Sequence, residues 1–139
     1  GAGEQTLNAL SQFGIPLGLA FQLRDDVLGV FGDPNVTGKP AGDDLREGKR
    51  TVLVGLTLEN VPASVSKIFN ELLVAGEIED EQLSFMRQTI TDSGALAKTE
   101  RMIEEHSTRA IEALAGLEVN NQARKMLSYL TEKVINRQS

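Results

Sequence analysis

Hydrophobic residues recur at three- and four-residue spacings along most of this chain, the period that is typical of amphipathic α-helices. No pair of segments alternates apolar and polar residues in the way that strands of a half-buried sheet do. The pattern therefore predicts an all-α fold. The helices are expected over residues 4–31, 62–75, 80–93, 95–115 and 121–136.

Two segments need a separate interpretation. Residues 51–58 (TVLVGLTL) are apolar and β-branched enough for a strand, but without a partner strand we interpret them as a buried helix. Residues 32–48 are rich in glycine and proline and predict a long loop, and loops of that length in compact domains are usually binding loops or lids. Asn60 is the expected N-cap of the next helix, and Gly76 is its expected end.

Three polar residues of the segment 17–31 and its two glycines fall on one narrow stripe of the predicted helix. Gly18, Gln22, Asp25, Asp26 and Gly29 occupy positions i, i+4, i+7, i+8 and i+11, and apolar side chains cover the other directions. A helix that is apolar on most sides is buried, so the two carboxylates should lie inside the protein or at the wall of a cleft. The alternative is a solvated acidic pair beside a surface loop.

A buried acidic pair near the C-terminal end of a helix requires a compensating cation, because the helix dipole disfavours negative charge there. The two stripe glycines leave space for one beside the acids. The chain has no cysteine and one histidine, His106, far along the sequence, so a zinc ligand set is missing. Mg²⁺ prefers carboxylates together with substrate phosphates, and the basic residues that follow are suitable counter-charges for phosphate oxygens: Lys39, Arg46, Lys49 and Arg50. Together with the apolar helix, this suggests a diphosphate with an apolar tail.

The segment GLAFQLRDDVLGVFGDPNVTGKPAGDDLREGKRT closely resembles the second aspartate-rich region of the trans-isoprenyl diphosphate synthases, the polyprenyl synthetase family. The resemblance is strong over residues 13–54 and looser over the later helices. It implies that Asp25 helps to ligate Mg²⁺, that Asp26 stands beside it, and that Asp44 approaches the same metal. The chain departs from the usual motif at its third acid, where Gly29 stands.

The resemblance also assigns the substrate contacts and the reaction. Gln22 and Lys39 would face the allylic substrate, and Lys49 would contribute to binding its diphosphate. Asp25, Lys39 and Gln22 would then be the catalytic residues of an Mg²⁺-dependent prenyltransferase. Such an enzyme condenses an allylic diphosphate with isopentenyl diphosphate to a longer trans-polyprenyl diphosphate, such as geranylgeranyl diphosphate. The family further implies a homodimer.

The first aspartate-rich motif of the family is absent from these residues, and an active enzyme of this class is about twice as long. We therefore expect residues 1–139 to be the C-terminal helical portion of a single polyprenyl synthetase domain, part of an isoprenoid-synthase-type helical bundle. The fragment alone should be inactive.

Composition adds limits on partners and location. Fourteen basic against 20 acidic residues give a net charge of −6, which argues against nucleic acid as a partner. No apolar run is long enough to span a bilayer. The lack of cysteine is compatible with the cytoplasm, where we expect the protein to work.

Two other functions remain open from the sequence. The chain could belong to a non-catalytic regulatory subunit of a heteromeric prenyl diphosphate synthase, although such subunits commonly lose the acids and lysines that this chain keeps. It could also be a helical dimerisation module with a vestigial loop. An intact first aspartate-rich motif upstream would favour the enzyme.

Overall fold

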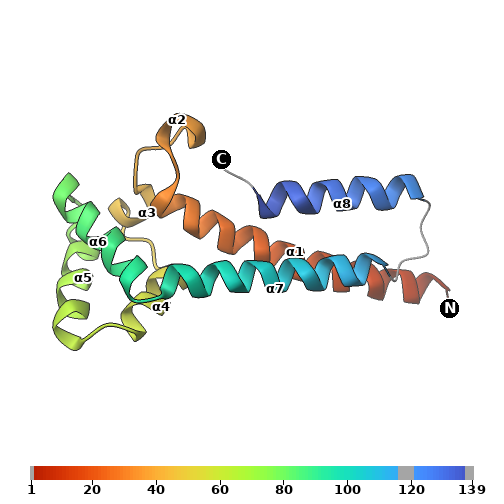
Figure 1. The fold of residues 1–139 in the computed structure, drawn as a ribbon, viewed down its shortest axis with the longest axis horizontal. Coiled ribbons are helices and arrows are strands. Elements are labelled where there is room, and N and C mark those ends of the chain that lie inside the picture. The colour runs from red at the N-terminus through yellow and green to blue at the C-terminus, as the bar shows by residue number, and fades with distance from the viewer. Residues whose placement is uncertain (1, 116–120, 137–139) are drawn as a thin grey trace. The chain divides into compact units, whose positions relative to one another are not determined.

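The structure, a computed structural model, describes residues 2–115 and 121–136, and helices are the only regular elements in these two ranges. This confirms the predicted all-α class. No helix in the described ranges is both long and apolar enough to cross a membrane. In chain order the helices are α1 (Ala2–Phe31), α2 (Pro34–Thr37), α3 (Asp43–Arg46), α4 (Val52–Glu59), α5 (Ala63–Ala75), α6 (Asp80–Asp92), α7 (Ala95–Ala115) and α8 (Asn121–Ile135) (Figure 1).

The ambiguous segment after the loop is the helix α4, as predicted. Its N-cap is Thr51, whose side chain accepts a hydrogen bond from the Val54 amide at 3.2 Å. The expected N-cap role of Asn60 is wrong. Asn60 instead closes α4, donating from its side chain to the Leu56 carbonyl at 2.7 Å. The next helix begins at Ala63, and its N-cap is Pro62. An N-cap directly precedes the first helical residue, so Asn60 lies too far upstream for that role.

The expected long loop is more ordered than its composition suggested, because it contains the short helices α2 and α3. Asp33 caps α2 by accepting a hydrogen bond from the Asn35 amide at 2.9 Å. Gly38 ends α2 in a left-handed conformation, with φ 73°. The chain therefore leaves α1 through a capped turn rather than an irregular segment.

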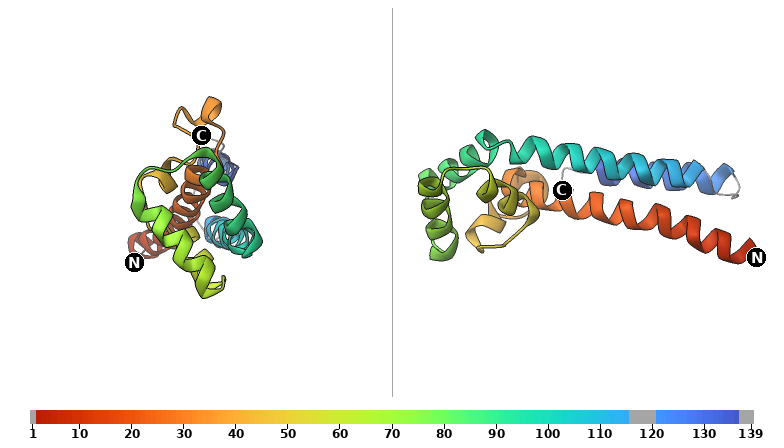
Figure 2. Two further views of the ribbon diagram at one scale, coloured as in Figure 1. Left: turned by 90° about the vertical axis from the view of Figure 1, so that its left-hand side faces the viewer. Right: turned by 90° about the horizontal axis from the view of Figure 1, so that it is seen from below.

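The chain divides into two compact units, and the first comprises Gly1–Arg24 and Arg101–Arg137. In it, the N-terminal part of α1, the C-terminal part of α7 and α8 run alongside one another (Figures 1 and 2). Their core is formed by Phe13, Ala110 and Leu114, with Leu127 packed against it.

This core covers only part of the α1 surface. In the first unit, the burial predicted for the segment 17–31 holds for Ala20 and Leu23 but not for Leu19 and Phe21. Four large apolar side chains of α1 are more than 40% exposed: Leu10, Ile15, Leu19 and Phe21. Burial of a helix on all sides needs packing partners on all sides, and within this unit α7 and α8 supply only the side at Phe13 and Leu17.

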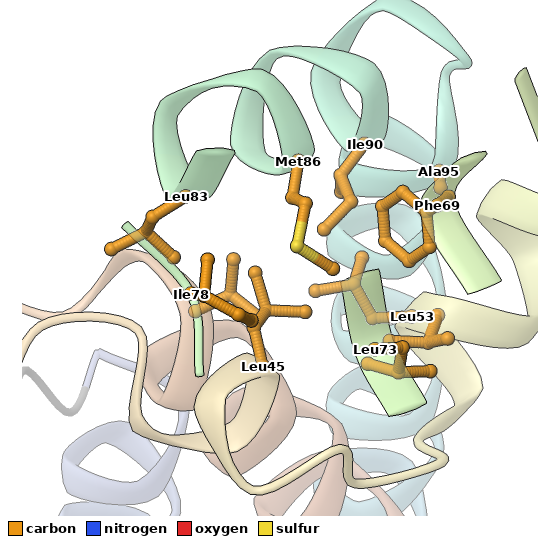
Figure 3. Packing of buried hydrophobic residues seen from close by; sticks show 11 residues of the cluster. Leu45, Leu53, Phe69, Leu73, Ile78, Leu83, Met86, Ile90 and Ala95 are labelled. Atoms are coloured by element: carbon orange, nitrogen blue, oxygen red, sulfur yellow. The ribbon is translucent and has the colours of Figure 1, made fainter. Parts of the chain in front are cut away.

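The second unit contains Asp25–Glu100 and holds the larger core. The C-terminal end of α1, the helix α3 and the helices α4 to α6 all contribute apolar side chains to it (Figure 3). Leu45 from α3, Leu53 from α4, Phe69 from α5 and Met86 from α6 have no exposed surface. Because α3 inserts Leu45 into this core, the second half of the predicted loop has a fixed position relative to the end of α1.

Candidate functional site

The acidic pair lies in the last two turns of α1, within the second unit. Asp26 is only 2% exposed and Asp25 is half-buried. The neighbouring Val27 and Val30 belong to the buried apolar residues. This burial contradicts the alternative of a fully solvated acidic pair. Carboxylates are almost never buried unless they are paired.

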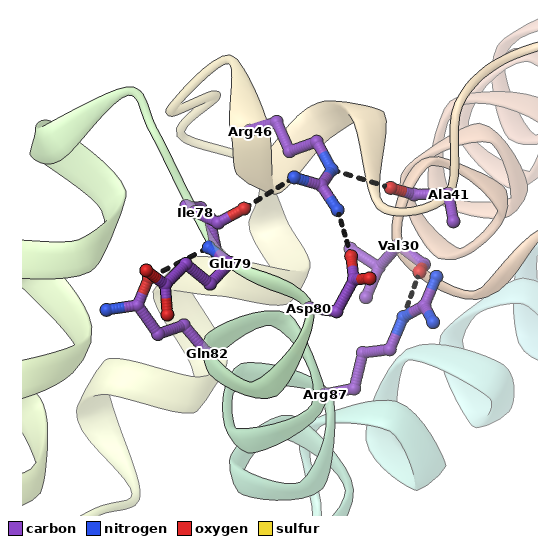
Figure 4. A network of polar contacts seen from close by, with 8 residues as sticks. All are labelled: Val30, Ala41, Arg46, Ile78, Glu79, Asp80, Gln82 and Arg87. Carbon is purple, nitrogen blue, oxygen red and sulfur yellow. Dashed lines mark hydrogen bonds and ion pairs between the residues drawn. The ribbon is translucent and has the colours of Figure 1, made fainter.

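The C-terminal end of α1 receives a cation from a distant part of the chain. Arg87 on α6 donates from Nε to the Val30 carbonyl, one of the last four of α1, at 2.8 Å (Figure 4). Burial, together with the nearby Arg46, lowers the pKa of Arg87, but a guanidinium stays charged in proteins. Arg87 was not among the predicted site residues. The one signal for it in the sequence is that it is the only basic residue of α6.

A second arginine, Arg46 on α3, holds the loop against the start of α6. Its Nε donates to the Ala41 carbonyl at 3.1 Å, its Nη1 to the Ile78 carbonyl at 2.6 Å, and its Nη2 to Asp80 at 3.2 Å (Figure 4). These contacts use the guanidinium within the protein itself, so we assign Arg46 to structure and not to the expected phosphate contacts. Arg50 likewise donates to the Asn70 side chain at 2.9 Å.

The start of α3 depends on a glycine in a left-handed conformation. Gly42 has φ 66°, and a Cβ there would also collide with Leu83 of α6. The close approach sets α3 against the core, and it places Asp43 and Asp44 in the first turn of the helix. Negative charge is favoured at that end of a helix.

The carboxylate of Asp44 lies directly against α1, at the position of Gly29. A Cβ on Gly29 would have the carboxylate atoms of Asp44 as its three nearest neighbours, with Oδ1 only 2.8 Å away and Oδ2 closer still. The sequence analysis expected the space at Gly29 to hold a cation. The structure instead fills that space with the carboxylate of Asp44.

The electrostatic surroundings of Asp44 connect the acids and lysines of the candidate site. Burial raises the pKa of Asp44; Lys49 lowers it, Asp25 and Asp26 raise it further, and Lys39 lowers it slightly. The Lys49 Nζ stands 3.9 Å from Asp44 Oδ2. The other four predicted acids and lysines therefore all act on Asp44, and all five residues belong to the second unit.

The oxygens of this region fit a hard divalent cation. Asp44 is 7% exposed, and its Oδ2 is buried and accepts no hydrogen bond from the described residues. Ligand oxygens of Asp43, Asp44 and Glu47 lie within 4.8 Å of one another. A donor set made only of carboxylates suits Mg²⁺ rather than a softer metal. Asp43 and Glu47, the first residue and the C-cap of α3, were not among the predicted ligands.

The remaining predicted residues are exposed. Lys39 follows α2, where its amide donates to the Thr37 hydroxyl at 3.2 Å. The Lys49 side chain is 45% exposed and can therefore reach both Asp44 and solvent. Gln22 lies on the part of α1 that belongs to the first unit, and it is exposed there.

Comparison with known proteins identifies a family that shares this part of the chain. The model of the polyprenyl synthetase family matches residues 1–90, which include α1, both loop helices and the acidic cluster. The chain belongs to the polyprenyl synthetase family. A geranylfarnesyl diphosphate synthase of Aeropyrum pernix is 35% identical over 138 residues, which are 99% of this chain and 42% of that protein. A geranylgeranyl diphosphate synthase of Mycobacterium tuberculosis is 51% identical over 59 residues, 42% of this chain and 17% of that protein.

Solved structures of this family have the same fold. The geranylgeranyl pyrophosphate synthase of Corynebacterium glutamicum, complexed with isoprenyl diphosphate and magnesium, matches 96% of this chain and 38% of its own. The match has a TM-score of 0.89 at 36% identity. The chain thus spans about two fifths of the length of several curated relatives.

Proposed function

We propose that the protein containing this chain is an Mg²⁺-dependent trans-prenyltransferase. It condenses an allylic diphosphate with isopentenyl diphosphate to a longer trans-polyprenyl diphosphate, such as geranylgeranyl diphosphate. The observation that carries the proposal is the buried Asp44 carboxylate beside α1, with Asp25, Asp26, Lys39 and Lys49 acting on it. The family membership and the relatives named as prenyl diphosphate synthases support the same reaction.

Three carboxylates would hold the metal: Asp25, Asp26 and Asp44. When bound, Mg²⁺ would supply positive charge that stabilises the diphosphate as it leaves the allylic carbon. The unsatisfied Oδ2 of Asp44 supports this assignment, since a buried carboxylate oxygen without a donor is unfavourable unless a cation is nearby. The protein's own contribution is to keep these acids in place before the substrate arrives.

Two lysines and one glutamine would contact the substrate. Lys39 and Lys49 donate to diphosphate oxygens and add fixed positive charge to the leaving group. Gln22 turns its side-chain oxygen towards the developing allylic cation. Lys39 and Gln22 are both exposed on the surface of the described chain.

We further propose that residues 1–139 form the C-terminal helical portion of a single synthase domain and that the protein is a homodimer. The coverage of the relatives supports a partial domain, since the chain aligns with about two fifths of each of several of them. The C-terminal placement stays a prediction from the resemblance. The homodimer and the cytoplasmic location stay predictions.

The test is prenyl transfer by the full-length protein. The purified protein is incubated with dimethylallyl, geranyl or farnesyl diphosphate and with radiolabelled isopentenyl diphosphate, with Mg²⁺ or with EDTA. We expect Mg²⁺-dependent formation of a longer allylic diphosphate. A full-length protein that binds the substrates but transfers no prenyl group, with each of the three allylic substrates, would support the regulatory-subunit alternative instead.

A further inference from the structure

We propose that Gly29 is a positioning residue of the metal site. Its missing side chain holds open the space that the Asp44 carboxylate occupies, so that α3 delivers an acidic ligand to the face of α1. This inference rests on the proposed function for the identity of the ligand, Mg²⁺ with a diphosphate. It assigns to Gly29 a role that does not require any side chain.

The position of Gly29 on the helix determines where that carboxylate lies. Gly29 follows Asp25 by four residues and Asp26 by three, and residues at these spacings share one face of an α-helix. The carboxylate that fills the space at Gly29 therefore lies over the same face as the two acids of α1. Three carboxylates that act on one another in this way repel each other unless a cation is bound between them.

A side chain at position 29 would displace the carboxylate without disrupting the backbone. The three atoms nearest to a Cβ at this position all belong to the Asp44 carboxylate, the movable end of a side chain. The expected response is that this carboxylate rotates away and that the helix remains intact. Gly55 on α4 makes a matched control, because a Cβ there meets nothing within 4 Å.

The hydrogen bonding of the Asp44 carboxylate is a separate observation that points to a bound ligand. Asp44 is more than nine-tenths buried, and no described residue donates a hydrogen bond to its Oδ2. Its ion pair with Lys49, at 3.9 Å, is long. A carboxylate in that state is stabilised by a cation that reaches it from the acidic face of α1.

The experiment measures binding of Mn²⁺ in the presence of inorganic pyrophosphate to the full-length protein, followed by electron paramagnetic resonance. Gly29→Ala should weaken Mn²⁺ binding by about 10-fold or more, the usual effect of disturbing the support of a metal ligand. Gly55→Ala should leave the affinity unchanged. Thermal unfolding of both variants verifies that they fold. Mn²⁺ affinity of Gly29→Ala equal to that of the wild type would overturn the proposal.

A second test, which moves the carboxylate from position 44 to position 29, applies even if Gly29→Ala folds poorly. Asp44→Ala should weaken Mn²⁺ binding, and adding Gly29→Asp should recover most of the loss, because the new carboxylate enters the space that Asp44 has left. A double variant that binds Mn²⁺ no better than Asp44→Ala would also overturn the proposal.

The results also separate this inference from the proposed function. If the wild-type protein transfers prenyl groups but Gly29→Ala leaves the Mn²⁺ affinity unchanged, this inference alone is rejected. Gly29-dependent Mn²⁺ binding without prenyl transfer would reject the proposed function alone.

Discussion

At the scale of single residues, the burial of two carboxylates distinguishes this site from an ordinary acidic surface. Asp26 is 2% exposed and Asp44 is 7% exposed. Burying an ionised carboxylate is unfavourable by several kcal/mol unless it is paired. The ion pair between Asp44 and Lys49 is long, at 3.9 Å. Without a bound cation, the buried Oδ2 of Asp44 therefore carries negative charge in an unfavourable place.

Asp25 should be essential for catalysis and dispensable for folding. In the full-length protein, Asp25→Asn keeps the shape of the side chain but removes the charge that would hold Mg²⁺. We expect kcat to fall by about 10²–10³, the usual loss when a group that stabilises transition-state charge is removed. Steady-state kinetics measures this. The control is Glu81→Gln, an exposed acid on α6. Unchanged activity and Mg²⁺ dependence in Asp25→Asn would show that Asp25 is not a ligand.

Asp44 should lower the stability of the metal-free protein at neutral pH. Its pKa is raised in the folded state, chiefly by burial, so the folded state binds a proton more tightly than the unfolded state does. The resulting loss of stability is complete above the raised pKa, and it is relieved as the pH falls through that pKa towards the ordinary value of 3.8. We therefore expect Asp44→Asn to raise the urea midpoint in EDTA at pH 7, by a margin that shrinks on acidification. A lower midpoint for Asp44→Asn would contradict this account.

The sequence was sufficient to identify the acids and lysines but not the contacts that organise them. Asp25, Asp26, Asp44, Lys39 and Lys49 were predicted from local motif chemistry, and the structure brings them into one electrostatic group. The contact of Gly29 with Asp44 joins residues 15 positions apart. The contact of Arg87 with Val30 spans 57 positions. Neither leaves a local pattern, because both depend on how the helices pack.

At the scale of elements, the two halves of the loop between α1 and α4 differ in how they are held. The half with α3 is anchored by Leu45 in the core and by the three hydrogen-bonding contacts of Arg46. The half with α2 contains no buried residue and is held by local capping bonds. Lys39 belongs to this second half, so the proposed diphosphate contact is on the less anchored side.

Hydrogen exchange should separate these halves. Without ligand, amides of residues 33–40 should exchange rapidly, while those of α3 should be protected, because local opening is easiest where few buried contacts exist. Mg²⁺ with an unreactive allylic diphosphate analogue should increase protection of residues 33–40 through Lys39. Mass spectrometry of the full-length protein with and without ligand measures both effects. Equal protection of residues 33–40 in the two states would show that this half is preformed.

Arg46 should contribute to stability through the carbonyls that it satisfies. Arg46→Lys leaves the Ala41 and Ile78 carbonyls with fewer donors, and hydrogen bonds from charged groups each contribute about 1.5–3 kcal/mol. We expect a free energy of unfolding lower by roughly this amount in urea titrations. The control is Arg50→Lys, which loses one exposed contact to Asn70. Equal effects of the two substitutions would contradict the assigned role of Arg46.

Helix ends were predictable where a cap residue was adjacent to the helix and not elsewhere. Gly76 ends α5 in a left-handed conformation, with φ 76°, as its position suggested. Asn60 failed as a cap because Pro62 occupies the position next to α5. The helices α2 and α3 were missed because four residues are too short for hydrophobic periodicity to be visible.

At the scale of the whole molecule, the chain exposes apolar surface that its own described residues do not cover. On α1, Leu10, Ile15, Leu19 and Phe21 are 42–66% exposed. The curated relatives are longer, with this chain aligned to 42% of the Aeropyrum pernix enzyme. Hydropathy predicted burial of the segment 17–31, but it could not state which part of a protein provides the covering layer.

We expect the 139-residue chain alone to transfer no prenyl group. Under the proposed mechanism, half of the metal site and the site for isopentenyl diphosphate are supplied by other residues of the synthase. The assay is the radiolabelled transfer reaction, with the purified chain compared with the full-length protein at equal concentration. Turnover by the isolated chain would contradict the division of roles proposed above.

The most direct test of the central claim is the location of the metal. Crystals of the full-length protein grown with Mn²⁺ and inorganic pyrophosphate can be measured at the manganese absorption edge. The account predicts an anomalous peak bonded to the Asp25 carboxylate on the acidic face of α1, with Asp44 beside it and Lys39 and Lys49 on the pyrophosphate. A manganese ion bound elsewhere, with Asp25 and Asp44 both away from it, would contradict the account.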